Sequence, residues 1–170
     1  MTTFDFGNGP VAAHQHSNGG GWVADTATVA STAYIGPDAL VYDNAQVSGN
    51  ARVYGKALVF DNAQVFDYAM VFGDALVFGN ALVFDKAWVF GKAWVYDNAQ
   101  VFDKAWVFGN ARVYGKARVY GKAQVSGDAR VFDEALVFDE AQVFDYAVVF
   151  GEARVSGDAE VSGHLQDCED

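Results

Sequence analysis

The sequence of 170 residues contains one cysteine, two prolines and three histidines. Because Cys168 is alone, no disulfide can form within the chain, and folding needs no oxidising compartment. No stretch approaches the roughly 18 consecutive apolar residues of a membrane-spanning helix, and the first residues lack the basic start and apolar run of a secretory signal. These absences predict a cytoplasmic protein with no membrane partner.

Basic residues are scarce in the last third of the chain. Up to Ser126 there are nine Lys and Arg against ten Asp and Glu, but from Gly127 onward twelve acids accompany only Arg130 and Arg154. The formal net charge is −11. A surface of this sign repels phosphates and anionic lipid headgroups. We therefore expect no nucleic-acid partner.

The sequence consists mainly of one six-residue repeat, which continues without a break from Ala27 to Val161. Alanine occupies every sixth position from 27 to 159, and valine or isoleucine follows each alanine two places later. A fixed short period indicates a solenoid, in which each repeat packs only against its neighbours. The prediction is therefore an all-β rod in place of a globular core.

Each repeat reads as a short strand followed by a corner. The residue between Ala and Val includes polar side chains such as Gln46, Arg52 and Glu160, which cannot line a dry core. Because side chains of a strand alternate between its two faces, Ala and Val point inward and the middle residue points outward. Gly, Asp and Asn then supply the positive φ that a corner requires.

The number of repeats in one coil is indicated by identical residues in the outward middle position. Six identities occur at a separation of 18, against two at 12 and three at 6 or 24. Like side chains stack favourably in neighbouring strands, so three hexads close one 18-residue coil. The 24 Val or Ile positions from Val23 to Val161 then give about eight coils, and a shaft roughly 40 Å long at about 4.8 Å per strand spacing.

Phrases such as "NALVFD" and "KARVYG" resemble the hexapeptide repeat of left-handed parallel β-helix proteins over about 140 residues. The resemblance implies a single-stranded left-handed parallel β-helix. The left-handedness of the coil is implied by the resemblance alone, because the spacing of the repeats does not reveal it. The stretch "GGGWVADTA" is similar to the opening of some uncharacterised bacterial and phage members of this class. Many members of the family are acyltransferases that act as trimers.

The repeat divides the chain into three parts. Residues 1–20 are predicted to form an N-terminal arm or a cap on the core, with a flexible hinge at Gly19–Gly21. Residues 21–163 form the hexapeptide-repeat solenoid. Residues 164–170, after the repeat breaks at His164, form an acidic tail.

The sequence argues against an enzyme. Family acyltransferases use a histidine base beside a loop that leaves the coil, but these hexads contain no insertion and the histidines, His14, His16 and His164, lie outside the repeat. A general base must titrate near neutral pH within reach of its substrate. We therefore predict no catalytic residue and no cofactor.

No metal site is predicted either. His14 and His16 share a strand face, yet two ligands without a third nearby do not define a centre, and we expect both to be solvated. A file of Asp67, Asp85 and Asp103 offers oxygen ligands for calcium, but lysines stand beside it. Mutual neutralisation of these charges is the preferred interpretation.

The outward positions are unusually apolar on some faces. Leucine and tryptophan residues and the rings beside them form a strip long enough to exceed what monomers usually expose. We predict an interface with a protein partner, a homodimer being favoured over a trimer. Its residues are Leu40, Tyr42, Leu58, Phe60, Leu76, Phe78, Trp94 and Tyr96, together with Trp88 and Trp106.

Two alternatives to this binding or scaffold role stay open. One is a phage-type inhibitor of a nucleic-acid-handling or defence enzyme, in which a row of Asp and Glu side chains mimics the phosphates of a nucleic acid. These acids are Asp128, Asp133, Glu134, Asp139, Glu140, Asp145, Glu152, Asp158 and Glu160. The other alternative is a structural fibre in which coil ends stack between molecules.

Overall fold

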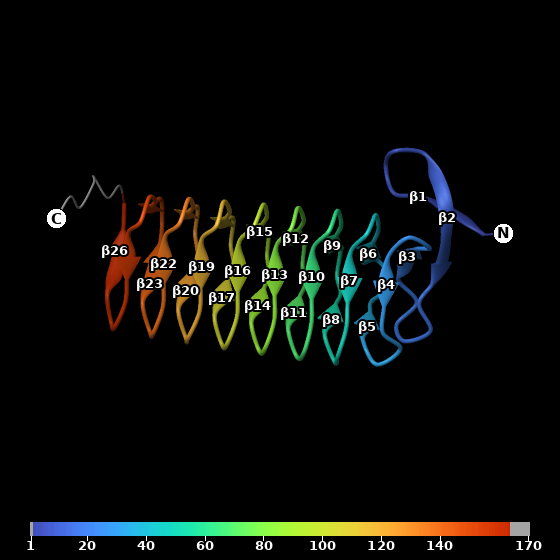
Figure 1. Ribbon diagram of the computed structural model, residues 1–170, viewed down its shortest axis with the longest axis horizontal. Coiled ribbons are helices and arrows are strands. Elements are labelled where there is room, and N and C mark those ends of the chain that lie inside the picture. The colour runs from blue at the N-terminus through green and yellow to red at the C-terminus, as the bar shows by residue number, and fades with distance from the viewer. Residues whose placement is uncertain (1, 164–170) are drawn as a thin grey trace.

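The computed structural model describes residues 2–163 and shows a straight solenoid with a hairpin at its N-terminal end (Figure 1). Every regular element among these residues is a strand, and no helix long and apolar enough to cross a membrane occurs among them. His164, Cys168 and the rest of the predicted acidic tail lie outside the described residues.

The coils build three sheets, one for each side of the shaft. The first sheet contains β1 (Thr3–Asp5), β2 (Pro10–Gln15), β3 (Trp22–Ala24), β6 (Leu40–Val41), β9 (Leu58–Val59), β12 (Leu76–Val77), β15 (Trp94–Val95), β18 (Arg112–Val113), β21 (Arg130–Val131) and β24 (Val148–Val149). The second contains β4 (Thr28–Val29), β7 (Gln46–Val47), β10 (Gln64–Val65), β13 (Leu82–Val83), β16 (Gln100–Val101), β19 (Arg118–Val119), β22 (Leu136–Val137) and β25 (Arg154–Val155). The third contains β5 (Tyr34–Ile35), β8 (Arg52–Val53), β11 (Met70–Val71), β14 (Trp88–Val89), β17 (Trp106–Val107), β20 (Gln124–Val125), β23 (Gln142–Phe144) and β26 (Glu160–Ser162).

The strand register confirms the 18-residue coil. Within the shaft each strand pairs in parallel with the strand one coil away, so that Leu58 lies opposite Leu76 and Val59 opposite Val77. The 24 strands from β3 to β26 make eight coils of three strands each. The predicted all-β solenoid with three hexads per coil is therefore confirmed.

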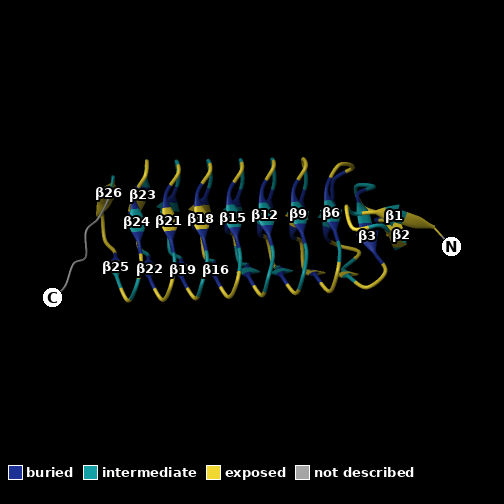
Figure 2. Cartoon of the chain, turned by 90° about the horizontal axis from the view of Figure 1, so that it is seen from above, coloured by how far each residue is buried: buried dark blue, intermediate teal, exposed yellow. Residues whose placement is uncertain are grey.

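The core is a column of small aliphatic side chains. From Ala33 to Ala147 every inward Ala, Val and Ile is 0% exposed, whereas Val149 and Val155 near the C-terminal end are 1% and 7% exposed. The outward residues are half-buried or exposed, and the corners are the most exposed part of each coil (Figure 2). The predicted inward and outward positions are thus confirmed.

The N-terminal residues extend the first sheet. Strands β1 and β2 form an antiparallel hairpin, and β2 pairs antiparallel with β3, the first strand of the shaft. Asp5 closes the hairpin turn, because its Oδ1 accepts hydrogen bonds from the Gly7 and Gly9 backbone N–H groups at 2.8 and 3.0 Å. The segment predicted as an arm or a cap thus lies against the first coil.

The loop between β2 and β3 covers the free edge of β5. The Ile35 N–H donates to the Asn18 carbonyl, and the Gly21 N–H donates to the Ile35 carbonyl, both at 3.0 Å. A Cβ at Gly21 would lie 2.3 Å from the Gly36 oxygen, and one at Gly19 would lie 2.1 Å from the Ile35 oxygen. The hinge predicted for Gly19–Gly21 is therefore wrong: these glycines allow a close approach of two backbones.

Candidate functional site

The outer face of the first sheet carries a row of apolar side chains. Leu40, Leu58, Leu76 and Trp94 are direct register neighbours in β6, β9, β12 and β15. No charged residue occupies this row between Leu40 and Trp94. The row ends where the Arg112 guanidinium lies 4.7 Å from the centre of the Trp94 ring, a distance typical of a cation–π contact.

A column of stacked rings runs beside this row. Tyr42, Phe60, Phe78 and Tyr96 stack with centroids 4.9 Å apart and interplanar angles of 1° to 3°. The predicted positions therefore come together on one face, which we call the apolar face: Leu40, Tyr42, Leu58, Phe60, Leu76, Phe78, Trp94 and Tyr96. All eight side chains are half-buried.

The ring column is longer than the sequence predicted. Phe6 of the hairpin stacks on Tyr42 with centroids 5.0 Å apart, and the column continues beyond Tyr96 to Tyr114, Phe132 and Phe150. Phe4 likewise stacks on Trp22 at 4.6 Å. The hairpin thus extends the aromatic surface, a contact that no period in the sequence signals because Phe4 and Phe6 lie outside the repeat.

The phenols of this face are uncharged at physiological pH, as an ordinary tyrosine with a pKa of about 10 already is. Burial raises the pKa of Tyr42 further, to about 12, with smaller contributions from the nearby carboxylates of Asp43 and Asp61. Burial also raises the pKa of Tyr96. The apolar face therefore presents neutral rings at physiological pH.

The two remaining predicted interface residues lie on another side of the shaft. Trp88 and Trp106 are register neighbours in the third sheet and stack with centroids 5.1 Å apart at 4°. Trp106 is 37% exposed. They therefore flank the corner between the second and third sheets and do not extend the apolar face.

Aspartates form many of the corners, as predicted, and they also bond to the next coil, which the sequence did not indicate. Nine corner aspartates have φ between +56° and +60°, and several accept hydrogen bonds from the backbone of the next coil. The Asp61 Oδ2, for example, accepts from the Gly79 N–H at 3.0 Å. Aspartate tolerates this left-handed conformation better than most residues, and here it also ties two coils together.

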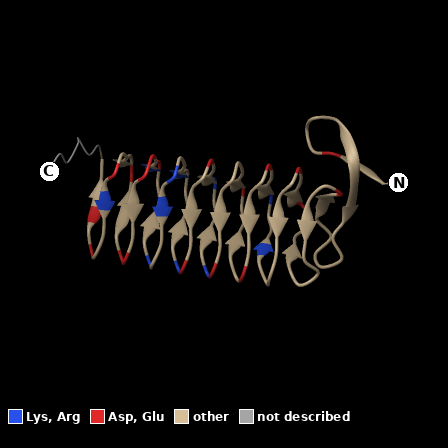
Figure 3. Cartoon of the chain, viewed as in Figure 1, with Lys and Arg blue, Asp and Glu red and all other residues tan. Residues whose placement is uncertain are grey.

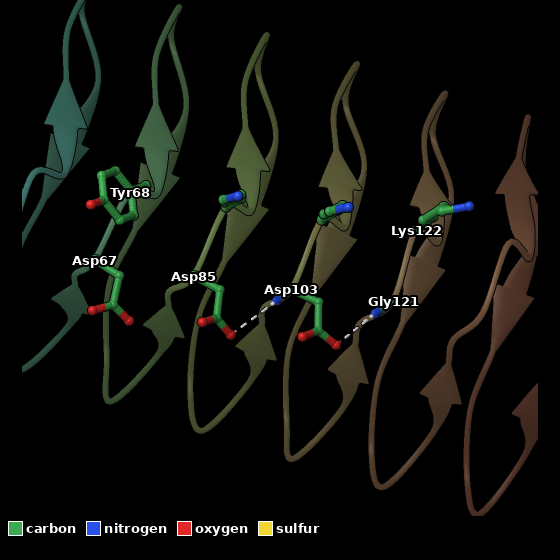
Figure 4. A pocket seen from close by; sticks show the side chains of 8 residues that line it. Asp67, Tyr68, Asp85, Asp103, Gly121 and Lys122 are labelled. Carbon is green, nitrogen blue, oxygen red and sulfur yellow. Dashed lines mark hydrogen bonds between the residues drawn. The ribbon is translucent and has the colours of Figure 1, made fainter.

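Within the file of Asp67, Asp85 and Asp103, the last two take part in this arrangement (Figure 4). The Asp103 Oδ2 accepts from the Gly121 N–H at 3.1 Å. Among residues 2–163 the ion pairs are His14–Asp25, Lys116–Glu134 and Lys122–Glu140. No lysine therefore forms a close ion pair with this file among the described residues, and Asp85 and Asp103 each accept a backbone N–H of the next coil instead.

Asp61→Ala should lower the melting temperature by roughly 4–8 °C. The change puts alanine in the left-handed region, at about 1–2 kcal/mol, and removes a charge-assisted hydrogen bond; about 2 kcal/mol corresponds to that shift for a domain of this size. Asp74→Ala is the matched control, since Asp74 is an exposed corner residue without positive φ. Thermal unfolding followed by circular dichroism compares the two, and equal shifts would contradict the assigned role.

A shallow groove of about 610 Å³ runs along the corner between the second and third sheets. Lys86, Lys104 and Lys122 stand one coil apart along it, and Tyr68 occupies the preceding coil (Figure 4). We call this edge the lysine corner. Trp88 and Trp106 line a second hollow, which shares the three lysines and Tyr68 with this groove.

The nine predicted acids are exposed but do not form one track. Glu134 and Glu152 lie at the corner after the first sheet, Glu140 and Asp158 at the lysine corner, and Asp145 at the third corner. Acids gather toward the C-terminal end of the shaft, as Figure 3 shows. Lys116 hydrogen-bonds Glu134 at 2.9 Å, which raises the pKa of Lys116 and lowers that of Glu134.

Several of the acids are already engaged within the chain. Glu140 pairs with Lys122, and Asp128 accepts from the Asn110 side chain at 3.0 Å. The carboxylates of Asp133 and Asp139 each accept a backbone N–H at 3.1 Å. The acidic surface thus wraps around the shaft, whereas imitation of a phosphate track needs the acids on one side.

The two described histidines differ in environment. The His14 Nδ1 lies 2.8 Å from Asp25 Oδ1, with both side chains exposed. His16 is 6% exposed, and the Asn18 N–H donates to its Nδ1 at 3.3 Å. The expectation of a solvated His16 is wrong, because the residue belongs to the packed loop. Residues 2–163 contain no group of three His, Cys, Asp or Glu side chains arranged for a metal ion.

Three segments of the shaft match the family model described as YdcK beta solenoid repeat: residues 45–61, 105–121 and 123–139. Each matched segment is close to one coil in length. No curated protein and no solved structure matches the chain. The family match and the architecture agree with the resemblance to hexapeptide-repeat β-helix proteins that the sequence indicated.

Proposed function

We propose that the protein is a rigid, non-enzymatic scaffold that binds protein through its apolar face, and that a second copy of the chain occupies this face. The observation that carries the proposal is the uncharged double column, Leu40 to Trp94 beside Tyr42 to Tyr96, which spans four coils. Charged residues occur at the corners of those same coils. Side chains held in parallel register leave little conformational entropy to lose on binding.

The length of the apolar face suits a second copy of the shaft. Arg112 ends the row of Leu and Trp side chains at one end, and Phe6 of the hairpin adds a ring to the stacked column at the other. A twofold pair brings one such surface against its own copy, which is the commonest arrangement of soluble homo-oligomers. Stacked aromatic and aliphatic side chains suit the dehydrated centre of an interface.

Two features support a non-enzymatic role. The strands of the shaft follow one another at six-residue spacing from β4 to β26, so no loop leaves a coil to enclose a substrate. His14 and His16 lie in the N-terminal segment, and a hydrogen bond to Asn18 occupies Nδ1 of His16. The surface of the shaft thus offers recognition in place of a general base.

Leu58→Glu combined with Leu76→Glu should convert a dimer into a monomer, because four carboxylates would face one another across the twofold axis without water. Light scattering after gel filtration at about 1 M salt measures the mass. The high salt is chosen because the Debye length is then only about 3 Å, so that contacts between exposed charges contribute little.

Gln46→Glu with Gln64→Glu is the matched control. These glutamines occupy the same outward position of the neighbouring strands β7 and β10 in the second sheet. The control also adds two negative charges to each chain, as the Leu58→Glu, Leu76→Glu variant does. The control should stay dimeric, and both variants should keep the wild-type circular dichroism. A wild type that is monomeric at high salt would overturn the proposal.

A further inference from the structure

The lysine corner carries charges in two blocks. Each coil contributes two residues to this corner, and the second of the two carries the charge. It is a lysine in three successive coils and an acid in the next two: Lys86, Lys104, Lys122, Glu140 and Asp158. All five side chains are exposed. Stacked rings of neighbouring coils lie 4.9 Å apart, so the charges form a ladder with the same repeat, positive in one half and negative in the other.

Two lysines of this ladder have no carboxylate partner. Among residues 2–163 no Asp or Glu oxygen lies within 4.0 Å of the Lys86 or Lys104 amine, whereas Lys122 pairs with Glu140. The aspartates beside them are engaged with backbone, as when Asp103 accepts from the Gly121 N–H at 3.1 Å. Lys86 and Lys104 are therefore available to an external anion.

We propose that the lysine corner is a second self-association surface, which pairs antiparallel with the lysine corner of another copy. A twofold axis at the level of Lys122 places Lys86 opposite Asp158 of the second copy and Lys104 opposite its Glu140. The same two contacts recur on the other side of the axis, as an isologous interface requires. A parallel alignment would instead place like charges opposite each other.

The occupant is argued from spacing as well as charge. Any second copy carries its carboxylates at the same coil repeat as the lysines, so that all four pairs form together without adjustment of either shaft. Lysine and glutamate one coil apart already bond at other positions of the chain, as Lys116 and Glu134 do at 2.9 Å. On the axis itself, each Lys122 keeps its bond to Oε1 of its own Glu140, and the second oxygen of that carboxylate faces Lys104 of the other copy.

The surface is distinct from the apolar face, and the inference does not rest on the proposed function. The lysine corner joins the second and third sheets, so it lies on the side of the three-sided shaft opposite the first sheet. Both contacts can therefore form on one molecule. Two twofold contacts on opposite sides of each molecule join the copies into a row. The contact at the lysine corner consists of exposed ion pairs, so the row forms only at low salt.

The test uses complementary charge reversals in the Leu58→Glu, Leu76→Glu background, which removes the apolar contact. This background should be dimeric at about 20 mM salt and monomeric at about 1 M salt, where exposed charges are screened. Adding Lys86→Glu with Lys104→Glu, or Glu140→Lys with Asp158→Lys, should leave monomers at low salt. An equimolar mixture of the two reversed proteins should recover the dimer.

Sedimentation velocity follows each sample. The control is Lys56→Glu with Lys92→Glu, the same change in charge at the corner between the third and first sheets, and it should stay dimeric. A monomeric background at low salt, or a mixture that does not associate, would overturn the inference. Failure of the apolar-face proposal is seen separately, as a wild type that is monomeric at high salt.

Discussion

Val95→Asp should abolish the cooperative folding of the middle of the shaft. Val95 is 0% exposed in β15 and stacks between Val77 and Val113. The inward positions around it hold only alanine and valine, so nothing could hydrogen-bond the carboxylate. Burying an unpaired charge costs several kcal/mol, which is comparable to the total stability of about 5–15 kcal/mol of many domains.

The same change near the end of the shaft should cost much less. Val155 in β25 is 7% exposed, and in a solenoid each coil depends only on its neighbours. Val155→Asp should therefore release the last coil and leave the others folded. Hydrogen exchange measured by mass spectrometry distinguishes the outcomes: loss of protection across the central coils for Val95→Asp, against loss confined to the C-terminal coil for Val155→Asp. Equal effects would contradict nearest-neighbour stability.

Gly91→Val should lower the melting temperature by roughly 5 °C or more. Gly91 has φ +70°, and a Cβ there would lie 3.1 Å from both the N and the O of Gly109 in the next coil. A left-handed conformation costs a residue with a Cβ about 1–2 kcal/mol, and valine adds branched atoms against that backbone. In a domain of this size each kcal/mol corresponds to about 2–4 °C.

Gly91→Asp separates the two causes. Aspartate adopts the same conformation at nine other corners, including Asp145 at the same corner of the shaft, and its carboxylate can accept an N–H from the next coil. We therefore expect a shift of less than about 2 °C for aspartate. Thermal unfolding followed by circular dichroism measures both variants. Equal losses for valine and aspartate would show that any side chain is excluded and that the corner geometry has been misread.

The regular part of the molecule followed from local rules. Ala57 and Val59 point inward and Leu58 outward because the side chains of a strand alternate, and that holds for every repeat. Stacked identities such as Leu58 and Leu76 then revealed the coil length, since parallel strands place like side chains together. The columns of the apolar face were predictable for the same reason.

Contacts made by residues outside the period could not be predicted. Phe6 and His16 lie in a segment with no repeat, so no spacing indicates that one stacks on Tyr42 and the other enters a packed loop. The corner aspartates were recognised as turn formers, but their bonds to the next coil depend on how closely the coils stack.

The sequence by itself determined a three-sided rod with aliphatic side chains inside, because a six-residue period fixes what each residue faces. Only the tertiary structure decided what closes the N-terminal end, which groups the corner carboxylates bind, and which lysines lack a carboxylate. Those outcomes depend on distances between residues far apart in the chain, and a periodic pattern specifies neighbours without specifying the atoms that meet.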